Sequence, residues 1–311
     1  MIISASRRTD IPAFYSEWFI KRVRAGFLLT RNPFNYNQVR RVSMTPKDVE
    51  AIVFWTRNPT NLIPYLSELD EKAFNYYFQY TITGYPRSIE RSVPNPHKAI
   101  RSFIDLSNKI GPRRVVWRYD PILLSNILPL EEHKRLFKKI AENLAGHTQR
   151  VIVSFSDFYK KTEKNLNKVD GLICSDIVQD LEALQNLSLF MKNISHQHGM
   201  EIFTCAEEIE TESIAHGKCI DESLLMRAFG ISFSNEKDKG QRAACGCIKS
   251  VDIGTYNTCL HGCSYCYATY SNERVISNKR AHDPDSPFLL GGTDGVDPEL
   301  LVEAYSQQSL L

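Results

Sequence analysis

Short hydrophobic runs alternate with amphipathic stretches along most of the chain. The runs are rich in Val, Ile, Phe, Tyr and Trp with little two-residue alternation, which is typical of strands covered on both faces. They predict strands at Ile2–Ser6, Ala51–Trp55, Tyr76–Thr83, Arg114–Tyr119, Val151–Phe155, Glu201–Cys205 and Ser250–Gly254. Helical spacing of apolar residues predicts helices at Pro12–Ala25 (with Asp10 as its N-cap), Glu131–Ala145 and Ile177–His198. This alternation predicts an α/β fold with a parallel sheet, either a barrel or a partial barrel.

Composition and charge indicate the compartment in which the protein works. The chain has 311 residues and a formal net charge of +2, so bulk charge neither favours nor excludes nucleic acid. No stretch approaches the roughly 18 apolar residues of a membrane helix, and the first residues lack the apolar core of a secretory signal. We therefore expect a cytoplasmic protein with no membrane partner, which suits unpaired thiols.

Three cysteines in the last third of the chain form the most informative motif. Cys259, Cys263 and Cys266 have the spacing C-x3-C-x2-C within the run YNTCLHGCSYCYA. Three thiolates can ligate three irons of a 4Fe–4S cluster and leave the fourth iron open, whereas a four-cysteine site is closed. A zinc site would usually use paired C-x2-C knuckles and need a fourth ligand, which His261 is poorly placed to supply. A disulfide fits a chain without a secretory signal badly.

A second set of four cysteines has the spacing C-x13-C-x25-C-x-C and comprises Cys205, Cys219, Cys245 and Cys247. Glycine between the last two lets the backbone turn so that both sulfurs face one metal. Four thiolates predict a closed site, either an auxiliary 4Fe–4S cluster or a zinc ion, and the dispersed spacing separates the two poorly. Partly buried cysteines without a ligand are the structural alternative. Cys174 stands apart and is interpreted as an ordinary buried cysteine.

The spacing of the first three cysteines resembles the cluster loop of radical S-adenosylmethionine (SAM) enzymes. In that superfamily the open iron binds the amino and carboxylate groups of SAM, and one electron breaks a carbon–sulfur bond to yield a 5′-deoxyadenosyl radical. The resemblance implies SAM and an open 4Fe–4S cluster as cofactors. It also implies an electron donor such as flavodoxin or ferredoxin, and hydrogen-atom abstraction from an unknown substrate.

The position of the cluster loop changes the expected topology. The loop usually follows the first barrel strand, but here it lies near the C-terminal end. A closed ring of strands has no privileged starting point. We therefore expect a circularly permuted partial TIM-type barrel, radical SAM-like, with the cluster loop near the C-terminus and the strand at 250–254 beside the strand at 2–6. Residues 1–270 would form this barrel, including the auxiliary site (205–247) and the cluster loop (259–266), and residues 271–311 a C-terminal cover.

Polar side chains gather where the predicted strands end, and strand ends of a barrel converge on one rim. Arginines there could hold the SAM carboxylate or an anionic substrate, and Asp120 or Glu207 the ribose hydroxyls or the amino group. Salt bridges such as Arg7–Asp10 and Arg118–Asp120 are the alternative. The catalytic candidates are Arg8, Asp10, Arg57, Arg118, Asp120 and His282. The cofactor-binding candidates are Thr83, Arg118, Asp120, Ser154, Tyr265 and Tyr267.

The resemblance to radical SAM enzymes gives Tyr265 a specific interpretation. In that superfamily the bulky residue before the last cysteine packs near the adenine of SAM, and an aromatic ring suits that role. A tyrosine buried in the core is the alternative.

The whole chain also resembles an uncharacterised bacterial family, domain of unknown function 1848, whose C-terminal cysteine cluster is like the start of radical SAM domains. The family-like segments are 4–12 (SASRRTDIP), 54–59 (FWTRNP), 81–85 (TITGY), 117–122 (WRYDPI) and 252–268. A weaker likeness, in the TGY and RYDP runs, is to spore photoproduct lyase.

These resemblances leave two alternatives to a radical SAM enzyme of unknown substrate. The photoproduct lyase likeness implies nucleic-acid repair or modification, although the chain has no evident basic stripe with interleaved aromatics. The other alternative, from a different class, is a non-enzymatic iron–sulfur or zinc-binding protein that senses redox state.

Overall fold

The computed structural model describes residues 1–207 and 213–302. Within them, eight strands form one sheet in the spatial order β10-β1-β4-β5-β6-β7-β8-β9, and every neighbouring pair is parallel. The strands are β1 (Ile2–Ala5), β4 (Ala51–Thr56), β5 (Tyr76–Thr81), β6 (Val115–Ile122), β7 (Arg150–Phe155), β8 (Glu201–Cys205), β9 (Ala215–Gly217) and β10 (Val251–Asp252). The predicted α/β class with a parallel sheet is confirmed.

The last strand of the chain lies at one edge of the sheet, beside the first. Ile3 pairs with Val251 and Ser4 with Asp252, which confirms the predicted neighbours. Counted from β10, the strands then follow in chain order across the sheet. Over the described residues no pairing joins the edge strands β9 and β10, so the sheet is open and a closed barrel is not observed. These edge strands have three and two residues, too few for a ladder that closes the ring.

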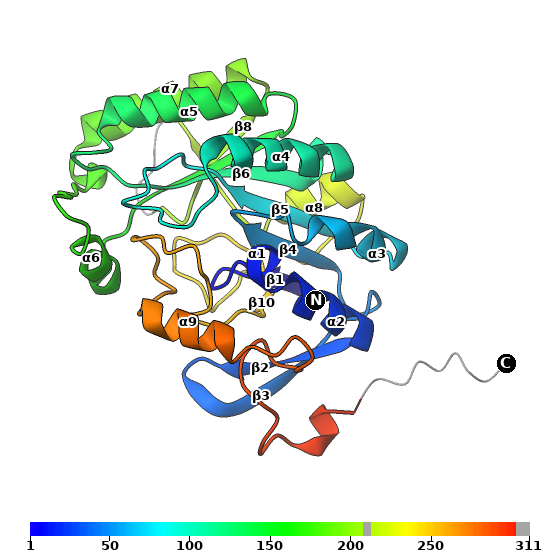
Figure 1. Ribbon diagram of the computed structural model, residues 1–311. Helices are drawn as coiled ribbons and strands as arrows, with labels where there is room; N and C mark the ends of the chain where they lie inside the picture. Colours follow the sequence, from blue (N-terminus) through cyan, green and yellow to red (C-terminus); the bar gives the residue numbers. More distant parts are fainter. Residues whose placement is uncertain (208–212, 303–311) are drawn as a thin grey trace.

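The sheet has a different core on each face, because successive strand residues point to opposite sides. Phe54 and Phe78 belong to the larger core, while Val53 and Tyr77 belong to the smaller one. Full burial of each aromatic ring stabilises the fold by roughly 2 kcal/mol. The larger core is covered by α2 (Ser16–Ala25), α4 (Pro96–Ile110), α5 (Leu130–Leu144) and α7 (Leu181–Gln197), which follow one another in Figure 1.

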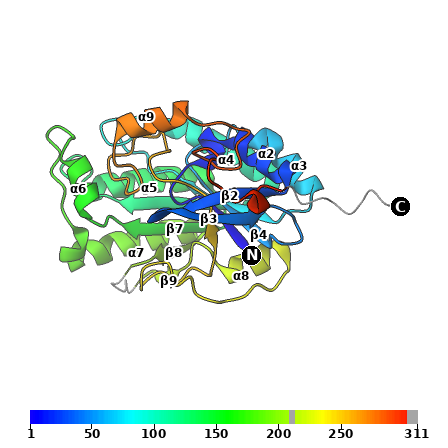
Figure 2. The same ribbon diagram turned by 90° about the horizontal axis from the view of Figure 1, so that it is seen from below.

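The smaller core holds the four cysteines of the second set. It is covered by α8 (Glu222–Phe229) and by irregular chain between Cys219 and Ile248. Figure 2 shows α2, α3 and α4 on one side of the strands and α8 on the other. The second cysteine set therefore lies against the face of the sheet that the long helices leave free.

Two of the predicted helices are interrupted. The first is α1 (Ile11–Phe14) followed by α2, because Tyr15 leaves the helical region at φ −139°. Asp10 caps α1 as predicted, accepting a hydrogen bond from Ala13 N at 2.9 Å. The stretch predicted at 177–198 is a short 3-10 turn, Ile177–Gln179, followed by α7. None of the described helices is long and apolar enough to cross a membrane.

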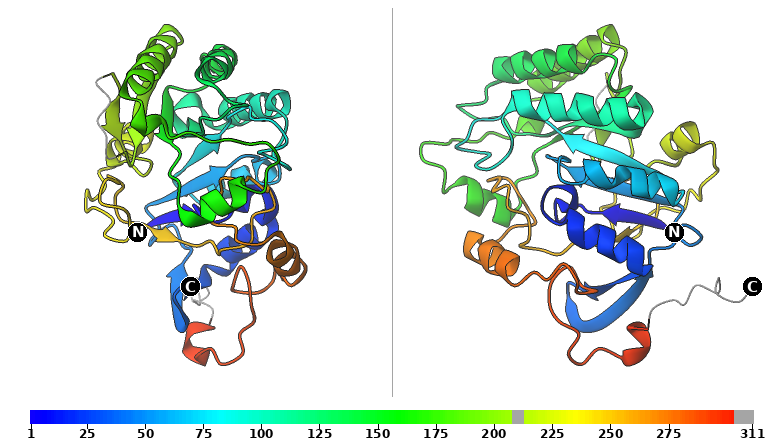
Figure 3. Two further views of the ribbon diagram at one scale, coloured as in Figure 1. Left: turned by 90° about the vertical axis from the view of Figure 1, so that its left-hand side faces the viewer. Right: turned by 45° about the vertical axis from the view of Figure 1, so that its right-hand side comes forward.

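Several elements were not predicted. They are the antiparallel hairpin of β2 (Phe27–Asn32) and β3 (Asn35–Ser43), the edge strand β9, the helices α4 and α8, and the helices α3 (Leu66–Glu71), α6 (Lys160–Leu166) and α9 (Asn272–Arg280). The chain after α9 packs on α2 and the hairpin: Trp18 Nε1 donates to Ser286 O at 3.0 Å, and Leu29 N to Pro287 O at 2.9 Å. Figure 3 shows this segment beside the hairpin.

A buried histidine in α5 makes stability depend on pH. The His133 side chain is fully buried, with Nδ1 3.0 Å from Tyr119 Oη and Nε2 3.1 Å from Leu123 O. Burial lowers the pKa of His133 from 6.5 to about 4. Below pH 6.5 the unfolded chain takes up a proton that the folded chain binds only near pH 4. We expect this group to lower the free energy of unfolding by about 3 kcal/mol between pH 7 and pH 4.

Urea unfolding at pH 7, 6, 5 and 4 checks this expectation. The variant His133→Gln should lose less stability on acidification than the wild type, by about 3 kcal/mol at pH 4. His97→Gln, which replaces an exposed histidine in α4, is the matched control and should follow the wild type. An unchanged pH dependence in His133→Gln would show that the imidazole is not held neutral.

Candidate active site

One cavity of about 820 Å³ opens among the loops that follow the carboxyl ends of the strands. Its walls include both cysteine sets, which extend from Cys205 to Cys266 in the sequence. The cysteines that line it are Cys205, Cys219, Cys245, Cys247, Cys259, Cys263 and Cys266. A volume of this size lies in the upper part of the range for ligand pockets.

Asp252 joins the strand before the cluster loop to the turn after β1. Its carboxylate accepts hydrogen bonds from Ser4 Oγ (3.0 Å), Ser6 Oγ (2.6 Å) and Arg7 N (2.9 Å). It also accepts from Gly254 N at 3.0 Å. A Cβ at Gly254 would lie 2.0 Å from Ser6 Oγ, so the close approach of the two turns requires glycine. The cluster loop is thus fixed to the first strand at its origin.

Asp10 fixes the cluster loop at a second point. Besides capping α1, its carboxylate accepts from Thr56 Oγ1 at 2.8 Å and Arg57 N at 2.7 Å. It also lies 2.7 Å from Nε2 of His261, between the first two loop cysteines. Asp10 lines the cavity, but its oxygens are already bonded to α1, to the end of β4 and to the loop. This predicted catalytic candidate therefore positions other groups.

A buried network lies behind Tyr265, the residue before the last loop cysteine. Arg57 Nη1 and Glu90 Oε1 form an ion pair at 2.9 Å, and Thr83 Oγ1 donates to Glu90 at 2.6 Å. The Tyr265 hydroxyl is bonded to both members of the pair. Burial raises the pKa of Tyr265, so the phenol stays protonated. The network anchors the ring at the cavity wall, where the predicted contact with a cofactor stays a prediction.

The backbone before α4 also holds the cluster loop. Ser264 N donates to Ile89 O and Ser92 N to His261 O, both at 2.9 Å. Burial raises the pKa of Cys259, and it raises the pKa of Cys263 to about 12. Both groups are therefore thiols at neutral pH, and a bound metal would have to displace their protons.

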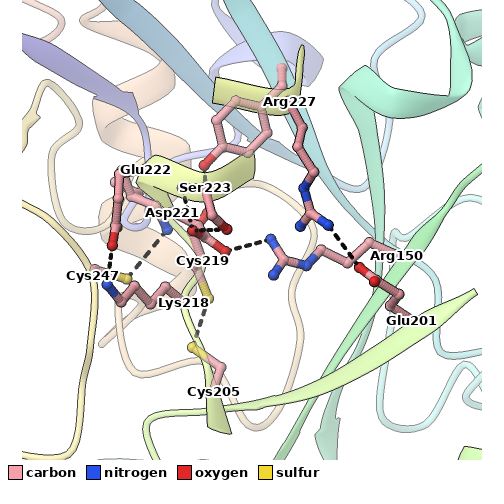
Figure 4. A network of polar contacts seen from close by, with 12 residues as sticks. Arg150, Glu201, Cys205, Lys218, Cys219, Asp221, Glu222, Ser223, Arg227 and Cys247 are labelled. Atoms are coloured by element: carbon pink, nitrogen blue, oxygen red, sulfur yellow. Dashed lines mark hydrogen bonds and ion pairs between the residues drawn. The ribbon is translucent and has the colours of Figure 1, made fainter. Parts of the chain in front are cut away.

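The second cysteine set is gathered by strand β8 and by the segment before α8. Cys205 Sγ and Cys219 Sγ are 2.6 Å apart, and Ile220 N donates to Cys247 Sγ at 3.4 Å. Figure 4 shows the side chains of Cys205 and Cys219 pointing toward each other. Hydrogen bonds from the thiols of Cys219 and Cys245 lower the pKa of Cys247, and the nearby Arg7 charge adds to the effect. Hydrogen bonds therefore link thiols of this set on the smaller-core face of the sheet.

Strand β5 and a buried ion pair hold Cys219 in place. The hydroxyl of Tyr77 and Nε2 of Gln79 both donate to Cys219 O at 2.6 Å. Two residues later, Asp221 pairs with Arg150 at 2.6 Å, with both side chains buried (Figure 4). Breaking a buried pair of this kind costs more than a surface pair, because it leaves a charge without compensation.

Arg118 connects the second cysteine set to the rim. Its Nε donates to Asp120 Oδ1 at 2.9 Å, so the ion pair considered from the sequence is formed. Its Nη1 lies 2.7 Å from Cys219 Sγ. Ser154 Oγ is 3.5 Å from Asp120. Arg118, Asp120 and Ser154 all line the cavity, with the guanidinium beside a sulfur and the carboxylate toward the strand ends.

The other predicted site residues divide between the cavity wall and its surroundings. Arg8 and Tyr267 line the cavity, and the Tyr267 hydroxyl donates to Arg7 O at 2.8 Å. His282 does not line it: Nδ1 lies 2.8 Å from Leu289 O, in the segment that packs on α2. Glu207 accepts from Phe155 N at 2.9 Å, and burial raises the pKa of its carboxyl to about 7.

Two buried residues of the site were missed from the sequence. Glu90 is the partner of Arg57, and no local motif marks it. His261 was considered only as a zinc ligand; it is 3% exposed, it lines the cavity, and its Nδ1 has no hydrogen-bond partner among the described residues. Its partner Asp10 was a predicted site residue, but nothing in the sequence indicated that the Asp10 carboxylate orients the His261 ring.

The two cysteine sets offer sulfur donors but, among the described residues, no ready-made ion site. In the part of the chain that the structure describes, no group of three or more His, Cys, Asp or Glu side chains is arranged to hold a metal ion. The two sets nevertheless offer soft sulfur donors, which select iron–sulfur clusters and zinc. These features describe an α/β protein with one large cavity walled by two groups of cysteines.

The chain belongs to the family described as Domain of unknown function (DUF1848), whose model matches residues 2–268 and so includes both cysteine sets. No curated protein matches the chain. Among solved structures, a proposed alpha-L-fucosidase from Bacteroides thetaiotaomicron VPI-5482 is similar over 76% of this chain and 85% of that chain, at 10% identity and a TM-score of 0.28. The likeness to spore photoproduct lyase is not shown by these comparisons.

Proposed function

We propose that this protein is a radical SAM enzyme in which Cys259, Cys263 and Cys266 hold an open 4Fe–4S cluster. The main support is that these thiols share one cavity with the arginine and tyrosine side chains at the strand ends. Three sulfur donors suit a cubane that keeps one iron open. The orphaned Nδ1 of His261 in the cavity wall adds a buried polar atom that a ligand could satisfy.

When bound, a reduced cluster supplies the electron that cleaves SAM and so starts hydrogen-atom abstraction from the substrate. The chain's own residues bind and orient the ligands. Among the described residues no carboxylate pairs with the Arg8 guanidinium, whereas Arg57 and Arg118 each have one. Arg8 is therefore a rim arginine that can take the carboxylate of SAM. The Tyr265 ring, with its hydroxyl anchored, provides an apolar face for the adenine.

The second cysteine set is proposed to hold an auxiliary 4Fe–4S cluster. Guanidinium groups of Arg7 and Arg118 lie beside its sulfurs and stabilise thiolates. Positive charge would serve a zinc ion's thiolates equally well. Iron is favoured because both sets face one cavity, so a second cluster would lie on the path of electrons to the first. A flavodoxin or ferredoxin is the electron donor that this proposal requires.

Anaerobic reconstitution with iron and sulfide tests the proposal. Iron and sulfide are counted per chain, and an electron paramagnetic resonance spectrum of the reduced protein is recorded with and without SAM. We expect about eight irons and a signal that SAM perturbs, together with 5′-deoxyadenosine in the reaction mixture. Zinc in both sites, or a cluster signal indifferent to SAM with no cleavage, would replace the proposal with a metal-binding or redox-sensing protein.

A further inference from the structure

Two stacked aromatic rings with a cation at each end line the mouth of the cavity. Cζ of Arg8 lies 5.2 Å from the ring centroid of Tyr256. The rings of Tyr256 and Tyr270 are stacked, with centroids 5.5 Å apart and planes at 21°. Lys161 Nζ lies 4.1 Å from the Tyr270 ring. All four residues line the cavity, and they come from the turn after β1, both ends of the cluster loop and α6.

The described part of the cavity wall carries a surplus of positive charge. It includes seven Arg and Lys side chains and three Asp side chains. Arg118 pairs with Asp120, Arg242 pairs with Asp157, and Asp10 is bonded to His261. Lys160 and Lys161 are exposed at the mouth, and no described carboxylate forms an ion pair with either. Both lysines can therefore take an anionic ligand, Lys161 by leaving the face of the Tyr270 ring.

SAM does not account for these lysines. It carries one carboxylate, which Arg8 can take, and its ammonium and sulfonium groups are positive. Two further cations at the mouth favour a second, anionic ligand there. Lysine is a point-charge partner for phosphate, and exposed tyrosine faces favour a planar ring. Tyr267 is 47% exposed and Tyr270 is 38% exposed. Tyr256 stacks on the Tyr270 ring and Lys161 lies over it, so a base that packs on Tyr270 takes the place of this lysine, which then turns to the phosphate.

We propose that the second ligand of this cavity, and hence the substrate, is a nucleotide unit: a phosphate ester that carries a planar base. Lys160 and Lys161 bind the phosphates, and the base packs on the tyrosine rings of the mouth. The proposal rests on the proposed function, since it takes the SAM cavity as the reaction chamber. A free nucleotide and a single-stranded nucleic acid share this chemistry.

Fluorescence anisotropy with the reconstituted protein tests the proposal. The probes are fluorescein-labelled twelve-nucleotide single strands of DNA and RNA, titrated at several NaCl concentrations. Two phosphate contacts predict a slope of about −1.4 for log K against log[NaCl]. Lys160→Ala/Lys161→Ala should weaken binding about tenfold and bring the slope close to zero. Tyr270→Leu should weaken binding without changing the slope, because stacking does not release counterions.

The control and the competitors separate the outcomes. Lys138→Ala/Lys139→Ala removes two lysines from α5, outside the cavity, and should bind like the wild type. If a mononucleotide displaces the probe at a similar concentration of phosphate groups, the natural ligand is a free nucleotide. If the probe stays bound, the natural ligand is a single-stranded nucleic acid. Absence of salt-dependent binding by both probes and mononucleotides, or equal loss in the α5 control, overturns the proposal. SAM cleavage measured on the same samples reports separately on the proposed function.

Discussion

Alanine at any one of the three loop cysteines should abolish SAM cleavage and leave a folded protein. Cys259, Cys263 and Cys266 would each supply one iron ligand, and two thiolates do not retain an open cubane. We expect iron to fall from about eight to about four per chain, because the second cysteine set keeps its own cluster. Iron analysis and chromatographic detection of 5′-deoxyadenosine measure the two effects on the same anaerobic sample.

Cys174→Ala is the matched control for these variants. Cys174 is half-buried, lies outside the cavity wall and forms a backbone bridge with Ser125 that does not involve its sulfur. It should keep full iron content and full cleavage. Circular dichroism shows whether each loop variant has folded. Undiminished cleavage in all three folded variants would remove the cluster from this loop and with it the proposed function.

The central strands of the sheet could be predicted because each is a short, continuous hydrophobic run in the sequence. Hydrophobic runs such as 51–55 and 151–155 are too continuous for a one-sided strand, and the structure places them inside the parallel sheet. The predicted neighbours, the strands at 2–6 and 250–254, do pair. That expectation came from the geometry of a ring of strands, which holds wherever the chain is cut.

Strands β3 and β9 were missed because neither carries a pattern of buried positions in its sequence. Strand β3 is exposed along most of its length, so its composition carries no burial pattern. It forms because β2 pairs with it in an antiparallel hairpin. Strand β9 has three residues, which is shorter than any periodicity can mark. Closure of the sheet was expected only by analogy, and the short edge strands do not provide it.

The cysteines could be grouped from the sequence, whereas the partners of the rim residues could not, except for the Arg118–Asp120 pair, whose members are neighbours in sequence. Short spacing grouped the three loop cysteines, as expected for ligands of one metal centre, and the other four were grouped because they lie in the same third of the chain despite their dispersed spacing. Ion pairs carry no such signature. Arg57 could have bound a ligand, but it forms an ion pair with Glu90, which lies in the loop between β5 and α4. Asp10 likewise contacts His261, which is 251 residues away in the sequence.

Replacing Asp10 should have the largest effect on stability. Its carboxylate is buried and accepts hydrogen bonds from Ala13, Thr56 and Arg57, while lying beside His261. Asp10→Ala removes a helix cap and leaves buried donors without an acceptor. We expect a loss of about 4 kcal/mol in the free energy of unfolding, measured in urea. Asp10→Asn keeps one acceptor oxygen and should lose less.

Asp180→Ala separates the cap from the network. Asp180 caps α7 by accepting from Ala183 N at 3.0 Å, but it is exposed and has no role at the cavity. Its removal should cost about 1 kcal/mol, the ordinary value of an N-cap. Asp10→Ala should also lower the iron bound after reconstitution, because His261 sits between Cys259 and Cys263 and loses its anchor. Equal losses of stability in the two variants, with iron unchanged, would mean that Asp10 caps a helix and does nothing for the cluster loop.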